Sequence, residues 1–120
     1  MYVIVDGADN SITLSKRLVK HMGVMDMNEQ PKVIVFRIPK NNAYGFMVNP
    51  VVDQETQLCD IQYNDKYKSI GFESLCPTVN RILYDYGIPS SRHRLSIKLF
   101  RTSEGKCYYQ ICKPNGEFAR

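Results

Sequence analysis

The spacing of apolar residues changes several times along the chain, and each change marks the boundary of a predicted element. Short runs rich in Val, Ile and aromatic side chains are typical of strands. They occur at residues 2–5, 33–38, 44–48, 58–63, 94–99 and 108–112. Residues 67–72 are expected to be a further short extended piece. Turn residues at 39–42 and 102–105 predict that two pairs of these strands are β-hairpins.

Two segments instead repeat their apolar residues at the period of an α-helix. The first repeat consists of Leu14, Leu18 and Met22. Gly23 ends it, and Asn10 or Ser11 is expected to cap its first turn. The second repeat consists of Val79, Ile82, Leu83 and Tyr86. Thr78 is its expected cap, and Gly87 its expected stop.

The predicted order of elements is β-α-β-β-β-α-β-β. It corresponds to an α+β fold, with a mixed, mostly antiparallel sheet and two helices packed on it. A chain of 120 residues is expected to be a single domain, residues 1–120, that buries a core without disulfides. Two helices cannot cover the whole sheet, so a leftover face or edge predicts a homodimer.

The composition excludes several classes of protein. Hydrophobic residues make up 43% of the chain and charged residues 23%, which is ordinary for a globular protein. No run approaches the ~18 apolar residues of a membrane span. The apolar start is too short for a signal peptide and is followed at once by Asp6. We therefore expect a cytoplasmic protein with no membrane partner.

The cysteines and histidines do not form a metal-binding motif. The cysteines are Cys59, Cys76, Cys107 and Cys112. None of them has the Cys-x-x-Cys spacing of a zinc site, and His21 and His93 lie far from them in sequence. We expect free thiols, no metal and no cofactor.

The net charge of +4 is distributed unevenly along the chain. Residues 41–65 contain four acidic side chains and no Lys or Arg, whereas residues 92–113 contain six basic side chains against Glu104 alone. This separation could steer an anionic partner to one side of the protein. It could equally pair basic strands with acidic ones, and the sequence leaves both interpretations open.

A phosphate-bearing ligand is the partner that these features favour. Helix N-termini bind anions through free backbone amides, and the second helix is predicted beside a basic strand. The candidate ligand-binding residues would add hydroxyl groups or positive charge there: Ser11, Ser74, Arg94, Lys98 and Arg101. Phe72 or Tyr108 could stack on a base. The alternative is structural: serines as ordinary caps, basic residues as a solvated hairpin face, and Phe72 as core.

The segment from residue 70 onwards resembles a known family. Ile70-Gly71-Phe72-Glu73-Ser74 precedes the predicted helix, and Arg94-Leu95-Ser96-Ile97-Lys98 follows it. This order is similar to that of the viral anti-CRISPR ring nucleases, small dimeric β/α proteins that bind and cleave cyclic tetra-adenylate. Asn10-Ser11-Ile12 is similar to that family's ligand-contacting loop. The resemblance implies a homodimer that binds a cyclic oligonucleotide.

Phe72 stands where that family has a histidine acting as general acid. Phenylalanine has no proton to donate, and losing a positioned acid typically costs about 10²–10⁴-fold in rate. The resemblance therefore implies a binding frame that has lost the ring-opening chemistry. His93, at the entry to a basic strand, is expected to be a surface residue. No other spacing arranges a nucleophile with a base, so a non-catalytic protein is predicted.

Two other functions stay open. Eight tyrosines and separated charges would also suit an accessory module for protein–protein interaction. Residues 77–83 are similar to the recognition helix of a winged-helix DNA-binding protein, although no convincing first helix precedes them. Salt separates the nucleotide-binding hypothesis from the protein-interaction hypothesis, because retention of a nucleic acid falls steeply with ionic strength.

Overall fold

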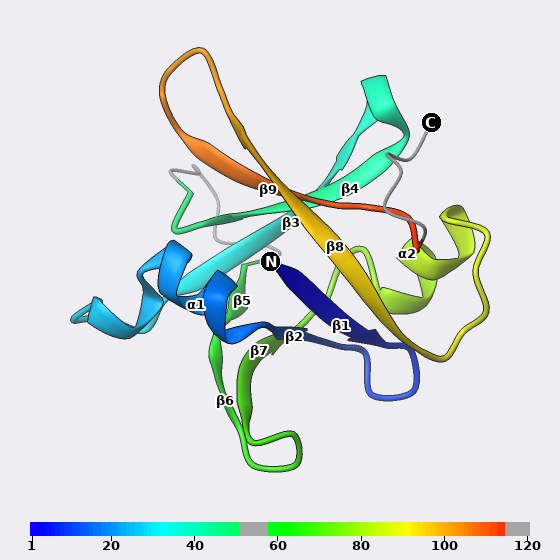
Figure 1. Cartoon of the computed structure of the whole chain (residues 1–120), viewed down its shortest axis with the longest axis horizontal. Helices are drawn as coiled ribbons and strands as arrows, with labels where there is room; N and C mark the ends of the chain where they lie inside the picture. Colours follow the sequence, from blue (N-terminus) through cyan, green and yellow to red (C-terminus); the bar gives the residue numbers. More distant parts are fainter. Residues whose placement is uncertain (51–57, 115–120) are drawn as a thin grey trace.

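The computed structural model describes residues 1–50 and 58–114 (Figure 1). Its strands are β1 (Tyr2–Asp6), β2 (Ser11–Leu14), β3 (Lys32–Ile38), β4 (Ala43–Val48), β5 (Cys59–Asp60), β6 (Gln62–Asn64), β7 (Ser69–Glu73), β8 (Arg92–Arg101) and β9 (Cys107–Ile111). Its helices are α1 (Lys16–Met22) and α2 (Val79–Asp85), with short 3-10 turns η1 (Val24–Asp26) and η2 (Pro39–Asn41).

All neighbouring strands are antiparallel, in the order β5-β3-β4-β9-β8-β1-β2-β7-β6. The two ends of this order are consecutive in the chain, because only Ile61 separates β5, which pairs with β3, from β6, which pairs with β7. Ile61 is buried, and its amide donates to the Pro31 carbonyl at 3.0 Å. The sheet therefore curls until its ends meet at one bent segment.

Strand β8 makes the corner on the other side. Its residues 92–96 pair with β1, and its residues 97–101 pair with β9. In Figure 1 it crosses the molecule as one long ribbon between these two partners. A single strand thus carries its side chains from one half of the curled sheet onto the other.

The hydrophobic core fills the inside of the curl. Successive side chains of a strand point to opposite faces, so alternate residues are buried. Phe46 lies at the centre, stacked on Tyr109 with ring centroids 5.4 Å apart and meeting Phe72 edge-on at 5.7 Å. The helices bury Leu18, Val19 and Met22 of α1, and Val79, Ile82 and Leu83 of α2.

The first predicted helix begins later than its apolar spacing indicated. Residues 11–14 form β2, with Ile12 and Leu14 buried and Ser11 and Thr13 half-buried on the other face. Helix α1 follows, and its N-cap is Ser15, whose hydroxyl accepts from the Leu18 amide at 3.3 Å. The helical spacing of Leu14 was misleading because a buried strand position leads directly into the buried face of a helix.

The α+β class is confirmed in its coarse form: a mostly antiparallel sheet with two helices. The predicted order missed β2, and the extended piece expected at residues 67–72 corresponds to strand β7, which runs from Ser69 to Glu73. The expected strand at 58–63 is the bent pair β5 and β6, because its two halves have partners on opposite sides of the curl. Thr78 caps α2, and Gly87 follows with a φ of 70°, as predicted. Asp53 and Glu55 lie outside the described residues.

The sheet ends bear on the expected dimer. They meet at Ile61, but β5 pairs with β3 only at Lys32 and Val33, so the rest of that edge of β3 has no paired strand among the described residues. The dimer stays a prediction. Within residues 1–50 and 58–114, no helix is long and apolar enough to cross a membrane. The same residues contain no group of three His, Cys, Asp or Glu side chains placed to hold a metal ion.

Candidate functional site

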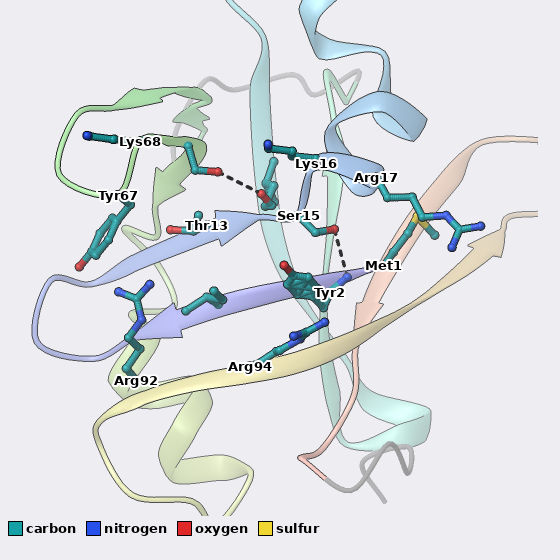
Figure 2. Close-up of a pocket in the computed structure, with 13 residues that line it drawn as sticks. Met1, Tyr2, Thr13, Ser15, Lys16, Arg17, Tyr67, Lys68, Arg92 and Arg94 are labelled. Carbon is teal, nitrogen blue, oxygen red and sulfur yellow. Dashed lines mark hydrogen bonds between the residues drawn. The ribbon is translucent and has the colours of Figure 1, made fainter.

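A hollow of about 560 Å³ opens on the outer face of the half-sheet formed by β8, β1, β2 and β7 (Figure 2). Five of its lining side chains are cationic: Lys16, Arg17, Lys68, Arg92 and Arg94. Two others, Tyr2 and Tyr67, are aromatic. We call this site the cationic hollow. Its residues come from the strands β1, β2, β7 and β8, the first turn of α1 and the loop between β6 and β7.

Arg92 and Arg94 enter the hollow through the alternation of β8. Leu95 of the same strand is fully buried, so its neighbour Arg94 points outward, as does Arg92 two residues earlier. Across the ladder Arg94 lies opposite Ile4, and Arg92 opposite Asp6. These two guanidinium groups therefore form one edge of the site.

Lys16 and Arg17 occupy the first turn of α1, which contains no acidic residue. The partial positive charge of a helix N-terminus favours acidic side chains there and disfavours cations. Ser15 positions this turn against β1, since its hydroxyl accepts from the Tyr2 amide at 3.3 Å as well as capping the helix (Figure 2). The sequence thus places two cations where local helix energetics oppose them.

Lys68 is the last residue of the loop between β6 and β7. It has a φ of 50°, in the left-handed region that costs a residue with a side chain roughly 1–2 kcal/mol. The Asn64 carboxamide oxygen shapes the loop by accepting from the amides of Lys66 at 2.9 Å and Tyr67 at 3.4 Å. A glycine would be the ordinary choice at this position. The lysine instead adds positive charge to the hollow.

Tyr67 ties this loop to the loop between β1 and β2. Its hydroxyl donates to Asp9 and, at 3.1 Å, to Asp6, while Lys66 forms an ion pair with Asp9 at 2.7 Å. Hydrogen bonds from Lys66 and Tyr67 hold the pKa of Asp9 below its ordinary value. The hydrogen bond to Asp9 raises the pKa of Tyr67, so that hydroxyl stays protonated and acts as a donor.

Two of the three arginines of the hollow, Arg92 and Arg94, stack on a tyrosine. The Arg94 guanidinium carbon lies 3.6 Å from the centroid of the Tyr2 ring, and that of Arg92 lies 4.6 Å from the centroid of Tyr67 (Figure 2). Cation–π contact orients a guanidinium without neutralising its charge. Arg92 also approaches Asp6, at 3.8 Å.

Four of the five cations have no acidic partner within residues 1–50 and 58–114. Among the described residues, Lys16, Arg17, Lys68 and Arg94 form no ion pair with a carboxylate. Elsewhere on the surface, Lys32, Lys66 and Arg81 are each paired with an aspartate. Like charges gathered without partners favour an anion that none of these residues supplies.

The sequence-predicted site is only partly assembled. Arg94 lies in the hollow, whereas Lys98 and Arg101 lie on the other half of β8, beside β9. The Lys98 ammonium lies 5.8 Å from the centroid of the Phe100 ring. Arg101 lines a different hollow, of about 490 Å³, together with Tyr109. The sequence could not show that one basic strand belongs to two halves of the sheet.

The prediction that Ser11 caps the first helix is wrong, because Ser11 belongs to strand β2. Ser74 is fully buried, and its hydroxyl donates to the Pro77 carbonyl at 2.5 Å. That hydroxyl is directed into its own loop. Neither serine lines the cationic hollow.

The predicted anion site at the start of α2 is occupied by the protein itself. The Thr78 hydroxyl accepts from the Arg81 amide at 3.3 Å, and the Asn10 carboxamide oxygen accepts from the Val79 amide at 2.7 Å. Asn10 was expected to cap the first helix but caps the second. The tertiary fold brings the loop between β1 and β2 against α2.

Phe72 and His93 have structural roles. Phe72 is a core residue packed on Phe46, so it does not stack on a ligand. His93 Nε2 lies 2.8 Å from the Pro89 carbonyl oxygen and 2.9 Å from the Ser91 hydroxyl. Along the curled sheet, three strand spacings of roughly 14 Å in total separate the backbones of these two positions. The Nε2 atom of His93 is directed to the turn before β8.

Sequence reasoning missed most of the hollow. Lys16, Arg17 and Lys68 carried a signal, since cations in a first helical turn and a lysine where a loop re-enters a strand are both locally unfavourable. Tyr2 and Tyr67 gave no signal, because tyrosine is common in strands. These two tyrosines contribute to the site because each has an arginine over its ring, and the fold decides which arginine that is.

Comparison with known proteins adds no further information about the site. No family model matches this chain, and neither a curated protein nor a solved structure matches it. The similarity of residues 70–98 to the ring nucleases stays a prediction.

Proposed function

We propose that this protein is a non-catalytic binder of a nucleotide or nucleic acid, which it holds by phosphate groups in the cationic hollow. The observation that carries the proposal is a set of four cations that have no carboxylate partner in the described part of the chain, beside two tyrosine rings: Lys16, Arg17, Lys68 and Arg94. Phosphate is the anion that arginine recognises with paired N–H donors. The tyrosines suit a ligand that has bases or sugars as well as charge.

Binding without catalysis is the form of the proposal that the lining residues support. None of the thirteen described residues around the hollow is a His, Asp, Glu or Cys. Among the lining residues, Tyr67 comes closest to being able to act as a general acid, but its raised pKa keeps its proton in place. A general acid or base works best with a pKa near the operating pH, which Tyr67 does not have.

Cyclic oligonucleotides belong to the proposed ligand class. The ring-nuclease resemblance favours them, and Arg94 of the matching segment contributes to the hollow. Ser11 and Ser74, which the resemblance also suggested, lie outside it. A cyclic tetra-adenylate therefore belongs in any ligand panel, beside linear single strands and duplexes.

A protein-interaction module is the second candidate, favoured by a different surface. Tyr84 of α2 is 77% exposed, and Leu75 just before this helix is 57% exposed. Large apolar side chains exposed in this way are common at interaction sites. The winged-helix reading has less support, because β7 rather than a helix precedes α2 within the described chain.

Fluorescence anisotropy with labelled ligands tests the proposal. Cyclic tetra-adenylate, single-stranded RNA, single-stranded DNA and duplex DNA would be titrated with the wild-type protein and with a Lys68→Gln, Arg94→Gln double variant. We expect at least one ligand to bind and the double variant to weaken it about tenfold or more, because two phosphate contacts are lost.

The matched control is an Arg37→Gln, Lys40→Gln double variant, which removes the same charge from exposed residues outside the hollow. Equal weakening by both variants would show a nonspecific charge effect and refute the assignment to the hollow. Failure of every ligand to bind would refute the proposed function and transfer support to the surface around Tyr84.

A further inference from the structure

The outward residues of β8 form a line that is longer than the hollow. Alternation places Arg92, Arg94, Ser96, Lys98 and Phe100 on the same outer face, while Leu95 and Ile97 are buried on the inner face. The strand has ten residues, so this line extends for roughly 30 Å. Only Arg92 and Arg94 lie in the cationic hollow.

The far end of this line carries an aromatic cluster on the outside of the sheet. Phe100 lies opposite Tyr108 of β9, and their rings stack with centroids 5.4 Å apart and an interplanar angle of 13°. Phe36 of β3 meets Tyr108 edge-on at 5.7 Å. All three side chains are half-buried, so each keeps part of its surface in contact with solvent. They lie outside the core that surrounds Phe46.

Aromatic rings and cations therefore accompany β8 along its length. Tyr67 and Tyr2 lie beside Arg92 and Arg94 at one end, while Tyr108 and Phe100 lie at the other, near Lys98. No acidic residue belongs to β8. A strip of this kind combines the two features that single-stranded nucleic acids require: positive charge for the backbone and ring faces for unstacked bases.

We infer that the ligand is a single strand of nucleic acid that lies along β8, with its phosphates in the cationic hollow and further bases against Phe100 and Tyr108. This inference rests on the proposed function and specifies its ligand class. A mononucleotide or a small cyclic ligand would fill the hollow without reaching the aromatic cluster. A duplex keeps its bases stacked and presents no ring face to Tyr108.

Ligand length provides the first test. Labelled oligothymidylates of about two and about ten nucleotides, and a duplex of the longer length, would be titrated by anisotropy at one salt concentration. We expect the long single strand to bind at least about tenfold more tightly than both other ligands. Equal affinity for the short and long strands, or tighter binding of the duplex, would overturn the inference and leave the proposed function intact.

A Phe100→Leu, Tyr108→Leu double variant provides the second test. Leucine keeps apolar bulk on the sheet while removing both rings, and circular dichroism checks that the variant folds. We expect about tenfold weaker binding of the long strand, since base–aromatic stacking is lost, and unchanged binding of the short one.

Tyr84→Leu is the matched control, because it removes an exposed ring from α2, away from β8. A long strand that binds the double variant and the control alike would refute a role for the aromatic cluster. If neither strand binds the wild-type protein, the inference fails, and if no ligand of the earlier panel binds either, the proposed function fails with it. The length series does not depend on the variants, so an unfolded variant still leaves a decisive result.

Discussion

The start of α2 and the cationic hollow both have the chemistry of an anion site, but only the hollow leaves that chemistry unused. At α2 the amides of Val79 and Arg81 already bind Asn10 and Thr78. In the hollow, Lys68 and Arg94 have no carboxylate partner among the described residues. A binding site is therefore identified by polar groups without a partner rather than by the type of element that carries them.

The largest expected effect concerns the start of α2, where the backbone amides of Val79 and Arg81 already have hydrogen-bond acceptors. Asn10 accepts from the Val79 amide, donates to the Ser74 carbonyl at 2.6 Å and has a φ of 55°. Asn10→Ala should lower the free energy of unfolding by about 2–3 kcal/mol, because it removes a cap, leaves a carbonyl without its donor and places alanine in a left-handed conformation. Urea denaturation measures this loss.

Ligand affinity of the folded Asn10→Ala protein should stay unchanged if α2 plays no part in binding. Asn10→Asp, which keeps the acceptor for Val79, is the control and should lose less stability. A variant that stays stable but no longer binds would show that α2 belongs to the site and would remove the contrast between the two regions.

The next effect concerns the salt dependence of binding. Arg94→Gln should weaken nucleic-acid binding about tenfold and reduce the slope of log K against log salt by about one, as expected when one phosphate contact is lost. Arg37→Gln is the control for charge alone. An unchanged slope would mean that Arg94 stacks on Tyr2 without contacting phosphate.

A smaller effect is expected at Lys68, where one substitution should raise the stability of the protein and weaken its ligand binding. Lys68→Gly relieves the left-handed strain of a lysine, offset in part by the greater flexibility of glycine in the unfolded chain, and should raise the free energy of unfolding by about 0.5–1 kcal/mol. It should also weaken ligand binding. Thermal unfolding and anisotropy together measure this exchange; a variant that is both less stable and equally able to bind would contradict it.

The smallest effect is the response of the Tyr67 network to acid. The pKa of Asp9 in the folded protein lies below the ordinary value of 3.8, so its stabilising effect is present above that pH and is lost as pH falls through the folded pKa. Wild type should therefore lose its advantage in thermal stability over Asp9→Asn below about pH 3.8. A constant difference across this range would show that the Asp9 carboxylate contributes no charge-dependent stabilisation.

Most of the local elements could be predicted from the amino-acid sequence. Short runs rich in Val, Ile and aromatic residues marked β1, β3 and β4, and the alternation of residues 94–99 marked β8. Thr78 and Gly87 marked the ends of α2, since a cap acts within a few residues. The sequence also located one residue of the hollow, Arg94. It failed at residues 11–14 because Leu14 satisfies both a strand period and a helix period, and only pairing with β1 and β7 decides between them.

The tertiary structure decided everything that depends on distance in space. Strand β8 is a corner because its first half pairs with β1 and its second half with β9, so Arg94 and Lys98 belong to different halves of the sheet although only three residues separate them. The fold also brings Lys68 and Lys16 into one hollow from distant parts of the chain. The spacing of apolar residues shows which side of each segment is buried. The partners of a charged side chain depend instead on the pairing of strands that are far apart in the sequence.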